Sequence, residues 1–315
     1  ALTASASASN KTYNGNTTAT TTLSFSGLIG SETLGQSVSS TFNNKNVGTG
    51  KTVTVNSITL SDGSNGGLAG NYTISTGQTT TANITAKALT VSGITASNKT
   101  YDANTVATLD LTGTSYSGLV AGDDISISAT GTFDNKNVGT GKTVNISSSY
   151  SGVDVGNYSI TDQSSTTANI TASVSGITIR GITANNKNYD GNNSATLDTS
   201  NVSYSGLVDG DDVTGSFSGT FSNANAASNK TVNISSSYSG ADVGNYTITD
   251  QSTTTGNIIA KALTASTSAS NKTYNGNTTA TVTLSFSGLI GSETLGQSVT
   301  AAFNNKNVGT GKTVT

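Results

Sequence analysis

The sequence contains no cysteine, histidine, methionine, tryptophan or proline, and only 10% of its 315 residues are charged. Without cysteine, disulfides, thiol catalysis and thiolate metal sites are all excluded. The usual general bases and activated nucleophiles are also missing, because histidine and cysteine supply most of them. We therefore expect no enzyme, and we predict neither catalytic nor cofactor-binding residues.

Two classes of partner are also disfavoured. The net charge is −3, and the basic residues do not form the strongly basic face of a nucleic-acid binder. No apolar run approaches the roughly 20 residues of a membrane helix, so we expect no membrane insertion in this segment. The sequence shows no signal peptide, and targeting and anchoring elements are expected outside it.

Serine, threonine and asparagine dominate what is present, together with 36 glycines. Such polarity could indicate disorder, but disordered chains usually carry high net charge and many prolines. Here threonine, valine, isoleucine, tyrosine and phenylalanine recur in alternating runs, which are typical of strands with one polar face. The composition therefore predicts ordered β structure.

The chain repeats itself at two scales. Tyr13, Tyr101, Tyr189 and Tyr274 lie in near-copies of one phrase, at spacings of 88, 88 and 85 residues. A longer period of 261 residues makes 1–54 and 262–315 identical at 49 of 54 positions. A period near 86 is too long for one turn of a solenoid and fits a small complete domain. We predict four β repeats, the last truncated: 1–87, 88–173, 174–261 and 262–315.

Residues 88–173 indicate the fold of one repeat. Alternating runs separated by turn residues predict strands over 88–97, 105–116, 125–133, 142–149, 156–160 and 166–172. Val106, Leu109 and Leu111 are the expected core residues of the second of these strands. Short strands at this spacing favour an antiparallel β-sandwich of immunoglobulin type, with a β-grasp-like module as the alternative.

The junction between the first and second repeats, residues 85–90, contains no proline, glycine or run of charge. Ile84 and Ala86 share one side of the pleat, whereas Leu89 and Val91 take the other. Because side chains alternate along a strand, the buried face is expected to switch near Lys87. A strand that serves two cores is no flexible linker. We therefore predict a stiff array in which each domain is rotated relative to the one before.

Several residues were considered as binding sites. Clustered carboxylates attract calcium, so the aspartates of two loops are calcium candidates: Asp123, Asp124, Asp209, Asp211 and Asp212. The matching loop of the first repeat has only Glu32, so we assign no metal ligand shared by every repeat. Tyr72, Tyr158 and Tyr246 follow a Gly-Asn pair, and we expect them to fill the core while each hydroxyl reaches a backbone partner. Stacking on carbohydrate is the alternative for these rings.

Two further motifs are interpreted as structural. Gly48-Thr49-Gly50-Lys51-Thr52 is similar to the end of a phosphate-binding loop, but that motif needs a glycine where Lys45 stands. A Lys–Asn isopeptide crosslink needs a nearby acid in every repeat, and the first repeat has only two acids. Turn chemistry explains both patterns better.

Four phrases together resemble the YDG-type repeat of large bacterial surface adhesins, the filamentous-haemagglutinin-like exoproteins. They are Lys-Thr-Tyr-Asp/Asn-Gly, Lys-Asn-Val-Gly-Thr-Gly-Lys-Thr-Val, Gly-Asn-Tyr-Thr-Ile and Thr-Thr-Ala-Asn-Ile-Thr-Ala-Lys-Ala-Leu-Thr. The sequence departs from the pattern at Ala103, which replaces the turn glycine, and over 225–230, where the glycine hairpin is lost. The resemblance implies a secreted, surface-attached stalk at the bacterial cell surface, and it carries no catalytic or binding residue across.

The expected function is a structural spacer in an extracellular adhesin or appendage, whose partners are neighbouring repeats of the same chain. One alternative is a self-assembling fibre or sheath, since lateral self-association through exposed edge strands would join chains. A second alternative is a repeat that binds glycans or ice through its tyrosines or threonine-rich faces. No host or surface ligand is identified.

Overall fold

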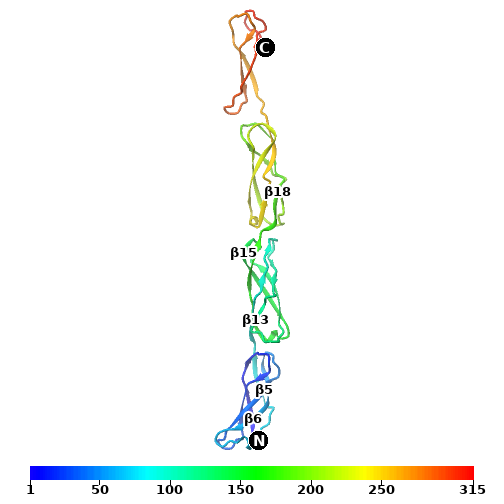
Figure 1. The fold of residues 1–315 in the computed structure, drawn as a ribbon, viewed down its shortest axis with the longest axis vertical. Helices are drawn as coiled ribbons and strands as arrows, with labels where there is room; N and C mark the ends of the chain where they lie inside the picture. The colour runs from blue at the N-terminus through cyan, green and yellow to red at the C-terminus, as the bar shows by residue number, and fades with distance from the viewer. The chain divides into compact units, whose positions relative to one another are not determined.

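The computed structural model describes residues 1–315, which divide into two compact units, Ala1–Thr171 and Ala172–Thr315. Each unit is described by itself (Figure 1). Strands make up 53% of the chain and no α-helix is present, which confirms the all-β prediction. The helical elements are three short 3-10 turns: η1 (Ala69–Asn71), η2 (Val155–Asn157) and η3 (Val243–Asn245).

None of these turns has the length or the apolar character needed to cross a bilayer. We refer below to residues 1–87, 88–173 and 174–261 as the first, second and third domains, and to residues 262–315 as the fourth segment.

The first domain is built from two layers of strands. One layer has the order β2-β7-β6-β5-β3, formed by β2 (Lys11–Thr12), β7 (Thr79–Thr85), β6 (Gly48–Asp62), β5 (Leu34–Phe42) and β3 (Thr18–Ala19). The other layer pairs β1 (Thr3–Ala8) with β4 (Thr21–Ser26), and an isolated parallel bridge joins Leu2 to Ile74. β2 pairs in parallel with the end of β7, so the turn that follows β2 lies where the domain leads into the next one.

The second domain repeats this arrangement. Its larger sheet has the order β10-β17-β15-β14-β11, formed by β10 (Lys99–Thr100), β17 (Ser165–Thr171), β15 (Gly139–Ser151), β14 (Ser126–Phe133) and β11 (Val106–Ala107). The opposite layer contains β13 (Ser115–Ser117), β8 (Lys87–Ser92), β16 (Tyr158–Thr161), β9 (Thr95–Ala96) and β12 (Leu109–Asp110). β8 lies between β13 and β16 and pairs in parallel with β16.

Unit 2 contains the third domain and the fourth segment. The larger sheet of the third domain is formed by β20 (Lys187–Asn188), β27 (Thr253–Ile259), β25 (Ala227–Ser239), β24 (Thr214–Phe221) and β21 (Ser194–Ala195). Its other layer holds β23 (Ser203–Ser205), β18 (Ser173–Arg180), β26 (Tyr246–Thr249), β19 (Thr183–Ala184) and β22 (Leu197–Asp198). The fourth segment pairs β28 (Thr264–Ala269) with β30 (Val282–Ser287) and β29 (Thr279–Ala280) with β31 (Ala301–Ala302).

The same core recurs in each complete domain. A phenylalanine at the end of one central strand is almost fully buried, and a valine on the neighbouring strand is entirely so. The residues are Phe42, Phe133 and Phe221, with Val53, Val144 and Val232. Since one face of each sheet packs on this core, the strands alternate buried and exposed residues, as the sequence pattern predicts.

Two details differ from the sequence prediction. The pairing is not uniformly antiparallel, because β2, β10 and β20 each run parallel to the strand that ends their domain. In addition, the strand expected over 88–97 is divided into β8 and β9, and the strand expected over 105–116 is broken into three short pieces, in which Val106 is 69% exposed. In the two-residue strand β11 only one side chain can face inward, and the structure buries Ala107, not the larger Val106.

Gly152 provides a test of the loop between β15 and η2. Its φ is +122°, and a Cβ atom there would lie 2.2 Å from the carbonyl oxygen of Asp124. We expect Gly152→Ala to destabilise the second domain by about 1–3 kcal/mol, because strain and overlap act together. Gly156→Ala is the matched control, since Gly156 has no atom within 4 Å of the added group and no positive φ. Urea denaturation of both variants checks the difference, and equal midpoints would contradict it.

Candidate functional site at the domain junction

A lysine organises the turn that carries each repeated tyrosine. The Nζ atom of Lys11 donates to the carbonyl oxygens of Asn16 at 2.7 Å and Thr18 at 3.0 Å, and to Oδ1 of Asn14 at 2.9 Å. Lys99, Lys187 and Lys272 bind the matching oxygens of their own turns. The ammonium group therefore closes the turn and fixes the direction of the tyrosine two residues further on, which explains why lysine and tyrosine recur together.

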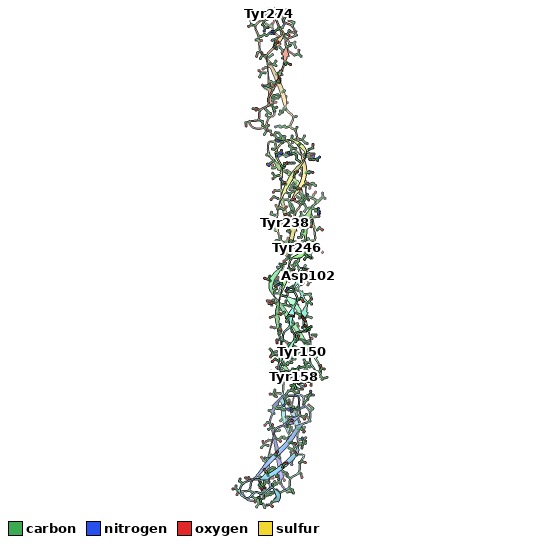
Figure 2. All side chains as sticks on the ribbon, viewed as in Figure 1. Asp102, Tyr150, Tyr158, Tyr238, Tyr246 and Tyr274 are labelled. Atoms are coloured by element: carbon green, nitrogen blue, oxygen red, sulfur yellow. The ribbon has the colours of Figure 1, made fainter.

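The turn places Tyr13 at the end of the first domain, against the second. Its ring is 1% exposed and meets the ring of Tyr158 edge to face, with centroids 5.5 Å apart. The hydroxyls of Tyr13 and Tyr158 both donate to Oδ2 of Asp123, at 2.8 and 2.6 Å. Figure 2 marks Tyr158 at the end of the second domain that adjoins the first. One carboxylate thus joins tyrosines from two domains.

Lys45 adds charge to the same contact. Its Nζ lies 2.8 Å from Oδ1 of Asp154 and 3.1 Å from Oδ1 of Asp123, and the side chains of these aspartates are only 7% and 3% exposed. The Lys45 ammonium also lies over the Tyr13 ring, 5.9 Å from its centroid. We call Tyr13, Lys45, Asp123, Asp154 and Tyr158 the junction cluster. It satisfies two nearly buried carboxylates with a cation and two hydroxyls, as buried charge requires.

The ionisation of these groups reflects their pairing. Hydrogen bonds to Asp154 and Asp123 raise the pKa of Lys45 above its ordinary value. The hydrogen bond from Lys45 lowers the pKa of Asp154. Burial opposes ionisation of Asp123, but hydrogen bonds from Tyr158, Tyr13 and Lys45 outweigh it and lower its pKa. The junction cluster is therefore charged at neutral pH.

Next to the junction cluster, the first and second domains share apolar contacts. Leu89 of β8 is fully buried in a single group with Ile84 of β7, Tyr13 and Tyr158. Only Ala86 separates β7 from β8, and the buried side changes from Ile84 to Leu89 across it. This confirms the predicted switch of face and places it at Ala86, one residue before Lys87. A hydrogen bond also joins the two domains, because Val47 N–H of the first donates to Oδ1 of Asn157 of the second at 2.9 Å.

The prediction that the Gly-Asn-Tyr tyrosines fill the core is confirmed for Tyr158 and Tyr246, whereas Tyr72 is only partly buried. Tyr158 and Tyr246 are each 8% exposed, and their hydroxyls accept from the backbone N–H groups of Val120 at 2.9 Å and Val208 at 3.1 Å. Tyr72 accepts from Ile29 N–H at 3.2 Å in the same manner. Each hydroxyl then donates to the acidic residue of the neighbouring loop: Glu32, Asp123 and Asp211.

The calcium candidates lie in these loops. Asp123 belongs to the junction cluster, and Asp124 is exposed and donates its backbone N–H to Oδ2 of Asp154. Asp209 is exposed, Asp211 bonds to the hydroxyl of Tyr246, and Asp212 accepts from Ala241 N–H at 3.2 Å. No group of three or more acidic residues is gathered in a way that could hold a metal ion. The calcium hypothesis stays a prediction.

Unit 2 contains a second contact of this kind, between the third domain and the fourth segment. The hydroxyl of Tyr189 donates to Glu293, and a Cβ atom on Gly191 would lie 2.9 Å from Cγ2 of Ile290. Gly15 has the same relation to Val120 in unit 1, at 2.7 Å. The structure therefore repeats the tyrosine–carboxylate bond and the close approach at glycine in both units.

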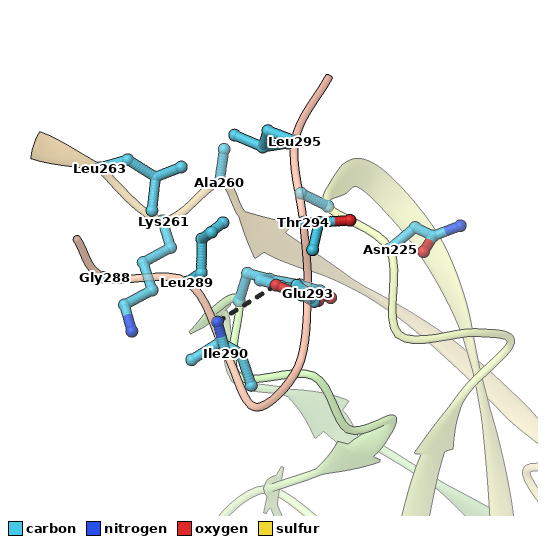
Figure 3. Close-up of a pocket in the computed structure, with 12 residues that line it drawn as sticks. Asn225, Ala260, Lys261, Leu263, Gly288, Leu289, Ile290, Glu293, Thr294 and Leu295 are labelled. Atoms are coloured by element: carbon cyan, nitrogen blue, oxygen red, sulfur yellow. Dashed lines mark hydrogen bonds between the residues drawn. The ribbon is translucent and has the colours of Figure 1, made fainter. Parts of the chain in front are cut away.

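A pocket of about 470 Å³ opens beside this contact, lined by Tyr189, Leu263, Leu289, Ile290 and Glu293 among others (Figure 3). These five residues are the sequence counterparts of the residues around Tyr158 in unit 1: Tyr13, Leu89, Leu119, Val120 and Asp123. Residues 262–315 contain no counterpart of Tyr158. The pocket therefore occupies the place of a packed tyrosine, and we do not interpret it as a ligand site.

The fold and the junctions define a class of tandem all-β repeat proteins in which adjacent domains pack on each other within unit 1 and within unit 2. The YDG domain matches the chain four times, over residues 1–82, 85–168, 174–255 and 259–315. The chain therefore belongs to the YDG domain family. Neither a curated protein nor a solved structure matches it.

Proposed function

We propose that this run of YDG domains is a structural spacer in a secreted bacterial surface adhesin or extracellular appendage. The observation that carries the proposal is the junction of unit 1, where Leu89, Tyr13 and Tyr158 share one apolar group across two domains. A spacer must resist bending between its domains, and a packed junction does so because bending would expose buried side chains. A flexible tether would need no such contact.

The extracellular setting is supported by composition. The chain carries no cysteine and no methionine, so it has neither a free thiol nor a thioether that an oxidising exterior could modify. Its resemblance to repeats of surface adhesins also supports an extracellular location. The partners of each domain are then its neighbours in the chain, and adhesion itself belongs to parts of the protein beyond these repeats.

The alternative of a laterally assembled fibre finds less support. The outer strands of each five-stranded sheet are only two residues long, as in β2, β3, β10 and β11. Short edge strands are a common protection against pairing between chains, because they offer few free backbone groups. The burial of Tyr13, Tyr158 and Tyr246 likewise leaves these rings no open face on which a sugar could stack.

Solution X-ray scattering on the full chain tests the spacer proposal. A compact protein of this length would have a radius of gyration of about 20 Å. A stiff spacer is expected to exceed this value at least twofold and to give the same curve with calcium and with chelator. A radius near the compact value would sink the proposal. If the scattering curve indicated a flexible chain only after chelation, the aspartate loops would instead be supported as calcium sites.

A further inference from the structure

The junction within unit 1 and the contact within unit 2 use different side chains at the same position. The third domain has Ala224 where the first has Lys45, and Ala226 where the first has Val47. Both residues lie in the loop before the strand that follows the phenylalanine of the core. At these two positions the third domain therefore presents small uncharged side chains, whereas the first presents a lysine and a valine.

The position of Asp154 also differs between domains. In the second domain, Asp154 immediately precedes η2 and receives Lys45. In the first domain, Leu68 immediately precedes η1 at the same position. The fourth segment, which follows the third domain, repeats the first 54 residues of the first domain at 49 positions. The domain with alanine is thus followed by a segment similar to the start of the first domain, and in the first domain itself the counterpart of Asp154 is Leu68.

The exposure of Leu68 and of the neighbouring Ile29 in the first domain supports an apolar partner for Leu68. Leu68 is 52% exposed and Ile29 is 73% exposed, although both are large apolar side chains. Their counterparts in the second domain, Asp154 and Val120, are covered by the first domain. In the fourth segment, Ile290 is the counterpart of Ile29 and lies against Gly191 of the third domain. The face with Leu68 and Ile29 therefore fits the uncharged end of a domain of the third type.

We propose that the residues at positions 45 and 154 form a matched pair that determines which domain packs after which. Lysine in the preceding domain requires aspartate in the following one, whereas alanine requires leucine. The inference stands on the contacts within each unit and does not depend on the spacer function. It assigns Lys45 and Asp154 the role of specificity-determining residues for domain order.

A mismatch is unfavourable in either direction. If an alanine-ended domain preceded the second domain, the carboxylates of Asp123 and Asp154 would be covered without a cation, and an unpaired buried charge is strongly destabilising. If a lysine-ended domain preceded a domain with Leu68, the lysine would lose Asp154 and lie against an apolar side chain. Specificity of this kind needs both the attractive pair and the penalty against the wrong neighbour.

The test is a double-mutant cycle in the full 315-residue chain, read by hydrogen exchange at the junction. Val47 N–H is the local probe, because its acceptor, Asn157, lies in the other domain. We expect Lys45→Ala to speed exchange of this amide about tenfold or more, since two carboxylates lose their cation. The double variant K45A/D154L, which combines the alanine of Ala224 with the leucine of Leu68, is expected to return to within about threefold of the wild type.

Two further variants keep the test decisive. Asp154→Leu also removes the acceptor of Asp124 N–H, so K45A/D154N keeps an oxygen at that place while removing the charge. Lys51→Ala is the matched control, because Lys51 lies in the same hairpin but binds Asn44 at 2.6 Å. The proposal is overturned if both double variants exchange as fast as K45A alone. It is also overturned if the substitutions at position 154 change the effect of K51A on the exchange rate of Val47 N–H as much as they change the effect of K45A.

Discussion

Replacing Leu89 by alanine is expected to destabilise the first and second domains together, by about 2–5 kcal/mol. Leu89 is fully buried, and it belongs to the second domain by sequence but packs with Tyr13 and Ile84 of the first. The shortened side chain leaves a cavity between the two cores, so neither domain keeps its packing at the junction. Urea denaturation combined with hydrogen exchange of peptides from both domains measures the effect.

Ile258→Ala is the matched control for this experiment. Ile258 is 2% exposed and packs with Phe221 and Val232 inside the third domain. A substitution of the same class there is expected to lower protection in the third domain and to leave the first domain unchanged. If Leu89→Ala reduced protection only within residues 88–171, the two cores of unit 1 would be independent, and the shared junction would be refuted.

The shared junction could be predicted in part from the sequence. The change of phase between Ile84 and Leu89 is visible as a pattern of period two, because a strand turns alternate residues to opposite faces. A different signal, the recurrence of an aromatic residue at one place in every repeat, predicts the tyrosines after Gly-Asn as core residues, and Tyr158 and Tyr246 are buried. Alternation thus predicts which side chains turn inward at the junction, but it fails over 105–116, where Ala107 is buried and Val106 is exposed.

The junction cluster could not be predicted in the same way. Lys45 and Asp154 are 109 residues apart, and each lies in a turn, where no periodicity constrains the direction of a side chain. The charge of Asp123 makes it a calcium candidate, whereas Lys45 stands out in the sequence only as a departure from a phosphate-binding motif. The sequence contains one signal for this lysine. The first and second repeats have a lysine at this position, Lys45 and Lys136, whereas the third has Ala224.

The parallel pairings escaped prediction for a related reason. Strands such as β2 and β10 are two residues long, so they carry no pattern of alternation by which a pairing could be recognised. Their place depends on Asn10 and Asn98, whose Oδ1 atoms accept from the backbone N–H groups of Asn83 and Asn169 at 2.7 Å. Such side-chain bonds to distant backbone are specific, but they become visible only once the chain is folded.

Raising the pH from about 10 to about 12 is expected to unfold the second and third domains. Burial, together with a hydrogen bond to Asp162, raises the pKa of Tyr150 to about 12, and burial with a hydrogen bond to Asp250 does the same for Tyr238. Burial and the bond to Asp123 raise the pKa of Tyr158 to about 12. The ordinary value is 10.0, so an unfolded chain loses these protons first.

The sign follows from linkage between ionisation and folding. Each of these hydroxyls is held protonated by the folded state, so its contribution to stability is complete below pH 10 and is lost as the pH rises toward 12. Ultraviolet absorbance of the phenolate and circular dichroism of the strands should therefore change together, and reversibly, over this range. In Tyr158→Phe the loss of stability with pH should be shallower, because one of the three titrating hydroxyls is gone. The prediction is contradicted if the phenolate absorbance develops fully while the circular dichroism of the strands is unchanged. In that case the tyrosines would ionise without unfolding the domains, and their hydrogen bonds to the aspartates would contribute little to stability.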